Sequence, residues 1–518
     1  MLGVTSLLAM SACGGSAARV PPATALVAPD QLNRLMVRYA EEYSRVNPRS
    51  PVPPNDLAPQ YLADSLDLER RYLNAVNGLS REGLDTHSRL TLDIFKRQRE
   101  LRVEGYTYPS ELMPLNPFEA LTPASSPRMS QILINMREGL RRGYMLPQVV
   151  VARSLAQLGN AADEAPAYAL LRNFLKTEYL PRARATVGLQ ALPLGEAWYA
   201  YRVRSVTGTG LTPAAIHKLG LLEVGRIKPR LLATLAISVA QHQPMRLYTT
   251  PQELVDSYKE LKTKVLALMP NLFAQVPADF DIRAMDAGVA SHTALNSPKL
   301  FFQSAEPGSV TGPAHLIVNT ADLANYPAFS MEALFLREAV PGNVLQMSLP
   351  TGAPSTASFR PEHYPAFEAG WALYAQSLGD ELGLYRDPDA KIAALSANFV
   401  CALSAVIDTG LHLKGWTRRQ ALEYLRAQMP PGLGSALDAD SIVDRSIALP
   451  AEALACKVGE IKIRALRDRA EKIWGTDFDI RDFHTQILQD GAMPLDILEL
   501  KIEEWIKSPH KAHQSQSD

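Results

Sequence analysis

The segment LREAVPGNVLQ, residues 336–346, comes closer to a catalytic pattern than other parts of this chain. Glu338 stands where a zinc-dependent peptidase places the glutamate that activates a metal-bound water. Such a site also needs two histidines on one helix face and a carboxylate from a second helix. Here Arg337 precedes the glutamate, and Asn343 and Val344 follow it. The segment therefore supplies the base and none of the metal ligands.

Four segments resemble successive blocks of the bacterial domain-of-unknown-function 885 family, which includes predicted lipoproteins related to zinc metallopeptidases. They are EALFLREAVPGNVLQ, FEAGWALYAQSLGDELGLYRDP, VIDTGLHLKGWTRRQALEYL and PAEALACKVGEIKIRALRDRAE. Upstream segments such as MREGLRRGYMLPQVVV are also similar, so the resemblance covers nearly the whole chain. It implies a mainly α fold, a large helical peptidase fold of the gluzincin type, and zinc as the cofactor of the family.

The family's central motif, H-E-x-x-P-G-H-H-L-Q, matches this chain at its glutamate and its Pro-Gly pair. Arg337 stands at the first histidine and Glu338 at the glutamate. Asn343 and Val344 stand at the paired histidines, and Ala369 stands at the first glutamate of the family's second block, E-G-W-A-L-Y-A-E. Asparagine is a poor zinc ligand. We therefore expect no metal site and no cofactor, although the family implies zinc.

These replacements predict a catalytically degenerate, peptidase-like protein that binds a peptide or another protein in the former active-site cleft. Arg337, where a dication would sit, could hold a ligand carboxylate through two guanidinium N–H groups, or it could simply neutralise Glu338. The alternative is an active peptidase-type hydrolase with a divergent metal site, or metal-free chemistry at a vestigial catalytic Glu338 together with His412. A structural or assembly role is a third hypothesis. Whether the chain is an enzyme stays open, with the missing ligands weighing against it.

His412 is the histidine that matches the resemblance, within the segment DTGLH. It is a candidate ligand-binding residue lining the same cleft. The alternative is a structural histidine that is bonded inside the protein. The histidines before the C-terminal tail are scattered, and no two of them have the spacing of a metal-binding helix face. His510 and His513 fall in the tail, where weak adventitious metal binding is the most that they suggest.

Composition excludes some classes of partner. The chain has 518 residues, and its 53 basic residues nearly balance 54 acidic ones. No basic stripe indicates nucleic acid or anionic lipid as a partner. No uninterrupted apolar run approaches the roughly 20 residues that cross a bilayer, and segments such as LLATLAISVA are typical of buried helix faces.

The N-terminal segment MLGVTSLLAMSACGGSAARV has the form of a targeting sequence, with a short apolar run, small residues and then Cys13. This resembles a bacterial lipobox, in which the cysteine becomes the lipidated first residue of the mature protein. We therefore expect lipidation at Cys13, a position in the bacterial cell envelope facing the periplasm, and membrane contact through the N-terminal lipid only. The alternative is an ordinary apolar stretch with an incidental cysteine.

Periodicity divides the chain into a signal segment 1–13, a tether 14–30, a single helical domain 31–507 and a disordered tail 508–518. The domain has an N-terminal helical half, 31–265, and a motif-bearing half, 266–507. A small β element is expected near 299–320, where KLFFQ and HLIVNT interrupt the helical pattern. Helices are expected over 326–348, 363–383, 389–413, 417–428, 451–474, 479–489 and 495–507, with a capping box at TRRQ.

Beyond Cys13, the cysteines are Cys401 and Cys456. Two cysteines cannot form the disulfide framework of a small secreted protein. They could join if their Cα atoms lie within about 7 Å. The sequence favours two separately buried thiols over a disulfide.

Overall fold

The computed structural model describes most of the chain outside its two ends. The described residues are 28–48, 54–118, 126–161, 166–241, 248–277, 279–285, 300–304, 314–321, 323, 326, 328–349, 363–431, 433 and 438–508. Cys13, most of the expected tether and the tail beyond Ser508 lie outside these ranges.

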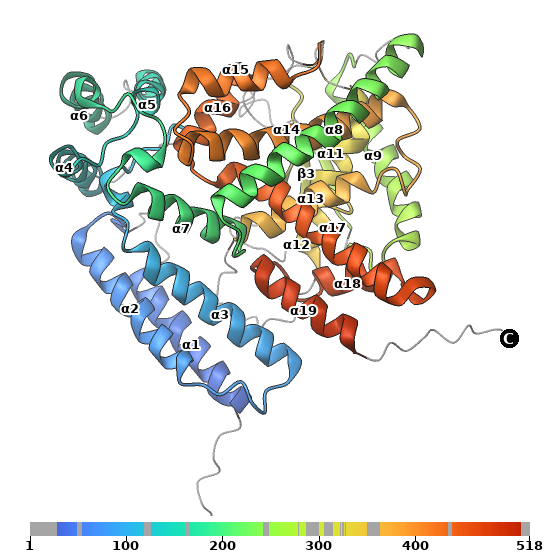
Figure 1. Ribbon diagram of the computed structural model, residues 1–518, viewed down its shortest axis with the longest axis horizontal. Coiled ribbons are helices and arrows are strands. Elements are labelled where there is room, and N and C mark those ends of the chain that lie inside the picture. The colour runs from blue at the N-terminus through green and yellow to red at the C-terminus, as the bar shows by residue number, and fades with distance from the viewer. Residues whose placement is uncertain are drawn as a thin grey trace, which may run out of the picture.

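The first three helices form a unit with its own apolar core (Figure 1). They are α1 Ala28–Val46, α2 Pro59–Asn77 and α3 Thr86–Gly105. Inside this unit the carboxylate of Glu69 pairs with Arg99 at 2.5 Å and accepts a hydrogen bond from the Tyr39 hydroxyl at 3.0 Å. The Arg99 guanidinium also lies 4.1 Å from the centre of the Tyr39 ring. A buried carboxylate is thus matched by charge and by hydrogen bonds.

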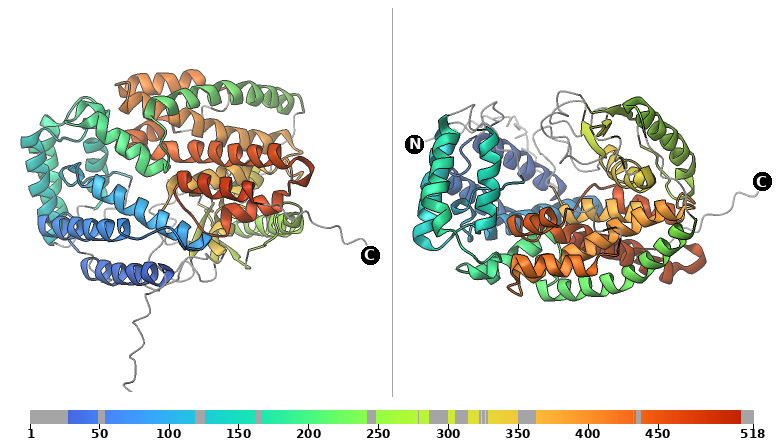
Figure 2. Two further views of the ribbon diagram at one scale, coloured as in Figure 1. Left: turned by 60° about the horizontal axis from the view of Figure 1, so that its bottom comes forward. Right: turned by 90° about the horizontal axis from the view of Figure 1, so that it is seen from above.

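The middle of the chain continues as helices. They are α4 Ser126–Arg142, α5 Gln148–Ala161, α6 Pro166–Phe174, α7 Gly195–Thr207, α8 Pro213–Gln241 and α9 Pro251–Leu268. Helices α4 to α6 share a second apolar core with α8 and with α14 to α16, far along the sequence. Seen from above, α8 forms an outer layer of the molecule (Figure 2).

A small sheet interrupts the helices, and it confirms the expected β element near 299–320. Strands β2 Leu300–Ser304 and β3 Ala314–Val318 pair antiparallel, and β1 Asp281–Ala284 lies parallel to β3 on its other side. The sequence analysis missed β1. Four residues with two charges among them carry too little alternation to mark a strand.

The remaining helices complete the structure, and the expectation of a mainly α fold is confirmed. They are α11 Met331–Glu338, α12 Asn343–Ser348, α13 Pro365–Ser377, α14 Pro388–His412, α15 Arg418–Gln428, α16 Ala439–Ala448, α17 Ala455–Trp474, α18 Ile480–Leu488 and α19 Leu495–Lys507. The capping box at Thr417 and Gln420 is present at the start of α15. Helix α16 was not among the expected helices.

Two close helix contacts organise the motif-bearing half. Helices α13 and α17 meet at Gly370 and Gly459, where a Cβ added to Gly370 would lie 2.4 Å from the Gly459 Cα. Only glycines allow the two backbones to approach so closely. Helix α14 is long and apolar enough to span a membrane, with a mean hydropathy of 1.8, but half of that stretch is buried in the protein, as in a core helix. It packs along α8 and beside α16.

Candidate ligand site at the end of helix α11

The expectation of one helix over 326–348 is wrong, because the chain breaks between α11 and α12. The peptide bond between Val340 and Pro341 is cis. At Gly342, an added Cβ would lie 1.9 Å from the carbonyl oxygen of Arg337, so no larger residue fits. The indole Nε1 of Trp371 on α13 donates a hydrogen bond to the Pro341 carbonyl oxygen at 2.9 Å. The turn is therefore held against α13.

This turn brings together the end of α11 and the start of α12. Arg337 Nε lies 3.3 Å from Oε1 of Glu338, and Asn343 Nδ2 donates a hydrogen bond to Oε2 of Glu338 at 2.9 Å. Both carboxylate oxygens are thus engaged by residues at positions where the family motif has histidines. The expectation that Arg337 pairs with Glu338 agrees with this geometry.

The site formed by Arg337 and Glu338 is partly accessible to solvent. The side chains of Arg337 and Glu338 are 26% and 22% exposed. Burial raises the pKa of the Glu338 carboxyl, and this effect outweighs the opposing effects of the Arg337 charge and the Asn343 hydrogen bond. The ionised carboxylate is therefore less favourable here than in water, even beside a guanidinium.

Arg337 keeps part of its hydrogen-bonding capacity. Within the described part of the chain, its only partner is Glu338, which is engaged through Nε. Its two terminal nitrogens, Nη1 and Nη2, have no acceptor among those residues. They form the edge of a guanidinium that binds a carboxylate in bidentate fashion.

The residues at the family's ligand positions do not fit a zinc ion. Arg337 places a cation at the first position, and the Asn343 amide is used by Glu338. Val344 is 1% exposed within the core, and Ala369 offers only a methyl group. Among the described residues there is also no group of three or more His, Cys, Asp or Glu side chains that could hold a metal ion.

His412 lies inside the protein, and its expected ligand-binding role stays a prediction. It is 1% exposed. Its Nδ1 accepts a hydrogen bond from the Leu189 amide at 3.0 Å, and its Nε2 donates one to the Ser446 carbonyl at 2.8 Å. Burial lowers the pKa of His412 to about 4. A neutral imidazole with both nitrogens bonded favours the alternative of a structural histidine.

Sequence reasoning missed a buried carboxyl one turn before His412. Asp408 is 0% exposed, accepts a hydrogen bond from the Tyr199 hydroxyl at 2.5 Å and accepts another from the Ala451 amide at 3.1 Å. Burial raises the pKa of Asp408 to about 7. An acid on an otherwise apolar helix was the available signal. Asp408 ties α14 to α7 and to the residue Ala451, whose φ is +72°.

The two cysteines are joined, so the preference for two separate thiols is wrong. Cys401 on α14 and Cys456 on α17 form a disulfide with a Cα–Cα distance of 6.1 Å. The sequence could not place them side by side, because the separation of 55 residues is closed only by the packing of α14 and α17.

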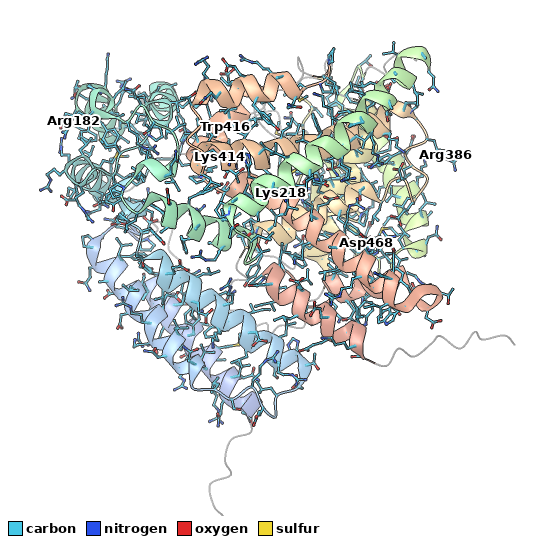
Figure 3. All side chains as sticks on the ribbon, in the orientation of Figure 1. Arg182, Lys218, Arg386, Lys414, Trp416 and Asp468 are labelled. Atoms are coloured by element: carbon cyan, nitrogen blue, oxygen red, sulfur yellow. A yellow bond between two sulfur atoms is a disulfide. The ribbon has the colours of Figure 1, made fainter. Side chains whose placement is uncertain are left out.

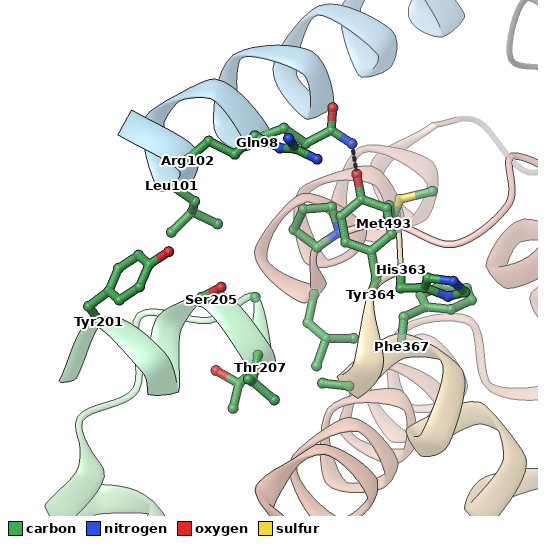
Figure 4. Close-up of a pocket in the computed structure, with 15 residues that line it drawn as sticks. Gln98, Leu101, Arg102, Tyr201, Ser205, Thr207, His363, Tyr364, Phe367 and Met493 are labelled. Atoms are coloured by element: carbon green, nitrogen blue, oxygen red, sulfur yellow. Dashed lines mark hydrogen bonds between the residues drawn. The ribbon is translucent and has the colours of Figure 1, made fainter. Parts of the chain in front are cut away.

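A cavity of about 190 Å³ lies where α3, α7, α13 and the start of α19 meet (Figure 4). Gln98 on α3 donates a hydrogen bond through Nε2 to the Tyr364 hydroxyl at its edge. Leu101, Tyr201 and Phe367 also line it. Neither Arg337 nor Glu338 does, so this cavity is a separate feature from the site at the end of α11.

Comparisons with known proteins identify a family and a fold. The family model described as "Bacterial protein of unknown function (DUF885)" matches residues 160–502. No curated protein sequence matches the chain. The crystal structure of a proposed lipoprotein from Colwellia psychrerythraea is similar, with a TM-score of 0.75 and 20% identity over 93% of this chain and 100% of that one. A proposed lipoprotein of unknown function from Shewanella oneidensis has a TM-score of 0.64 and 14% identity over 92% of this chain and 99% of that one. At these identities the likeness concerns the fold.

Proposed function

Since this chain belongs to the DUF885 family of bacterial proteins of unknown function, we propose that it is a catalytically degenerate member that binds a peptide or another protein at Arg337. One observation carries the proposal. Both oxygens of Glu338 are engaged, by Arg337 and Asn343, which stand at ligand positions of the family motif. A general base needs a free oxygen within hydrogen-bonding reach of the proton that it removes. Glu338 instead holds Arg337 in place.

Arg337 is the group that would bind the ligand. Its Nη1 and Nη2 edge suits a carboxylate, because two parallel N–H groups match two oxygens. The half-buried position strengthens such a contact relative to one in open water. The ligand class is therefore a peptide or protein segment that presents a C-terminal carboxylate or an acidic side chain.

The chain also fits a location in the bacterial cell envelope. The two solved structures compared above are described as proposed lipoproteins. The segment before Cys13 has the lipobox form. We propose that a lipid at Cys13 anchors the protein and that the helical domain faces the periplasm.

The second candidate is a metal-free hydrolase acting through Glu338. The observation that favours it is the raised pKa of this carboxyl, which makes Glu338 a better proton acceptor than an ordinary glutamate. It requires Glu338 to release Asn343 or Arg337 when substrate binds. Hydrolysis of peptides by the metal-free protein, abolished by Glu338→Gln, would support this candidate against the first.

Affinity selection tests the binding proposal. The protein is incubated with a mixed pool of N-acetylated hexapeptides that have free C-terminal carboxylates, and retained peptides are identified by mass spectrometry. We expect the wild type to retain acidic or free-carboxylate peptides and to retain fewer from the same pool with amidated ends. Arg337→Gln is expected to lower retention about tenfold or more, because a lost charge-assisted contact costs roughly 1.5–3 kcal/mol.

Arg386→Gln is the matched control, because Arg386 is exposed and has no partner among the described residues. It removes the same charge from another part of the surface and should leave retention unchanged. Retention that is equal in the Arg337 and Arg386 variants would contradict a role for Arg337, and so would a wild type that retains no peptide.

A further inference from the structure

Helix α8 exposes an apolar outer face, contrary to the expectation that LLATLAISVA forms a buried helix face. Five of its large apolar side chains are between 42% and 66% exposed: Leu221, Leu222, Leu232, Ile237 and Val239. Soluble proteins place single apolar residues at the surface, but a row of them along one helix indicates an interaction surface.

The exposed residues form a face because of their spacing. Leu221, Leu222, Gly225, Pro229, Leu232, Ala233, Ala236, Val239 and Ala240 recur at three and four positions along the helix, and all of them are exposed. The opposite side carries Ile216, Val224, Ile227 and Leu231, which are buried. This buried side faces α14, where an added Cβ on Gly220 would lie 2.8 Å from Val406. The outer face extends over roughly 30 Å, at 1.5 Å per residue.

The charges along this face are positive. Lys218 and Arg230 are exposed, and neither has an acidic partner in the part of the chain that the structure describes (Figure 3 labels Lys218). The one acid of the helix, Glu223, pairs with Arg226 at 2.6 Å and with the buried Lys457 at 3.2 Å. Its charge is therefore neutralised within the protein, and an approaching surface meets apolar groups flanked by cations.

We propose that the outer face of α8 lies on a membrane surface with anionic headgroups. Apolar side chains flanked by lysine and arginine are the pattern of helices that lie in the interface, where the cations meet lipid phosphates. A second protein surface would have to supply matching acids as well as apolar area. The sequence analysis expected membrane contact through the lipid at Cys13 only, and the outer face of α8 adds a second contact.

The middle of the outer face of α8 suits a position among the lipid headgroups. Pro229 lies inside α8 and has no N–H to donate to the carbonyl of Gly225. Both residues are exposed on the outer face. An unpaired carbonyl is costly in hydrocarbon but is readily hydrated among headgroups. The face therefore fits the interfacial layer and not the bilayer core.

Vesicle flotation tests this inference without the lipid anchor. The full chain carrying Cys13→Ser is mixed with vesicles of phosphatidylethanolamine and phosphatidylglycerol, or of phosphatidylcholine alone. We expect the protein to float with the anionic vesicles and much less with the neutral ones. The triple variant Leu222→Gln, Leu232→Gln, Val239→Gln should lower binding about tenfold or more, because the apolar contact is lost.

The matched control is Ile134→Gln, Leu170→Gln, Leu500→Gln, which replaces equally exposed apolar residues on α4, α6 and α19. It should bind like the wild type. A charge variant, Lys218→Gln with Arg230→Gln, should lose the preference for anionic vesicles while keeping the apolar face. Thermal unfolding checks that each variant is folded.

Three outcomes would overturn the inference. They are absence of wild-type binding to the anionic vesicles, equal binding of the α8 triple variant and its control, and self-association in sedimentation that the α8 triple variant abolishes. The last result would assign the face to a second copy of the chain. Because these assays involve neither Arg337 nor a peptide, their failure leaves the proposed function untouched.

Discussion

Asn343 Nδ2 donates a hydrogen bond to Oε2 of Glu338 across the turn between α11 and α12, at 2.9 Å. The residue at a histidine position of the motif that this segment resembles is thus bonded directly to the residue at its glutamate position. With Arg337 on the other carboxylate oxygen, the cluster forms a self-contained polar unit. In this arrangement neither carboxylate oxygen of Glu338 is without a partner.

Glu338→Gln tests the electrostatics of the cluster. Burial raises the pKa of Glu338 in the folded protein. Between its unfolded and folded pKa values the native state holds more protons, so stability falls as the pH rises through that range. Glutamine has no such charge and can still accept from Asn343. We expect Glu338→Gln to be at least as stable as the wild type at pH 7 in denaturant unfolding, with its advantage shrinking below the unfolded pKa. A variant that is less stable at pH 7 would show that the ionised pair with Arg337 dominates.

The variant His412→Phe tests whether His412 contributes to stability or to peptide binding. It keeps a ring but leaves the Leu189 amide and the Ser446 carbonyl unpaired, so we expect a loss of roughly 2–4 kcal/mol in the free energy of unfolding. Peptide retention per folded molecule should not change. A variant with normal stability and lost peptide binding would show that His412 belongs to the ligand site.

The stability of the protein should also depend on pH because His412 is buried in its neutral form. Its folded pKa of about 4 lies below the ordinary value of 6.5. The unfolded state therefore binds more protons in this range, and stability present above pH 6.5 is lost as the pH falls toward about 4. The stability difference between the wild type and His412→Phe should shrink over this window. An unchanged difference would contradict a buried neutral imidazole.

Gly342→Ala tests the turn that shapes the site. An added Cβ would lie 1.9 Å from the Arg337 carbonyl oxygen, so the turn must open, and we expect a loss of about 3 kcal/mol or more together with weaker peptide retention. Gly225→Ala is the control, because an added Cβ there meets no atom within 4 Å on an exposed helix. It should gain about 0.5–1 kcal/mol. Equal effects of the two substitutions would show that the turn tolerates rearrangement.

The bond between Cys401 and Cys456 should stabilise the packing of α14 and α17. Replacing both cysteines by alanine is expected to lower the free energy of unfolding by roughly 2–4 kcal/mol, since the unfolded chain loses a constraint. Mass spectrometry of the alkylated, unreduced protein checks the bond itself. Two modified thiols at these positions in protein purified under non-reducing conditions would contradict the disulfide.

The sequence predicted what local patterns determine, and it failed where distant segments meet. Helical periodicity and the capping box at Thr417 placed most helices of the C-terminal half. The break at Val340 and Pro341 was missed, although proline and glycine stood in the segment, because the apolar pattern continues on both sides. The bonds of His412 depend on η4 Leu189–Ala191 and on α16, which only the folded chain brings together.

The candidate site was predictable in its residues but not in its contacts. The resemblance singled out Arg337, Glu338 and Asn343. It could not show that Asn343 reaches back over the turn to Glu338, because that contact depends on the backbone between them. The outer face of α8 was misread for a related reason. An apolar segment shows that burial is favourable, and only the packing shows which side of the helix is covered.

Zinc stoichiometry tests the central claim most directly. The untagged full chain carrying Cys13→Ser is equilibrated with a small excess of zinc, desalted and measured by elemental analysis. The account predicts a folded protein that retains far less than one zinc per chain, since the ligand positions hold Arg337, Asn343, Val344 and Ala369. Retention of about one tightly bound zinc per chain would contradict it and would establish a metal site with a different set of ligands.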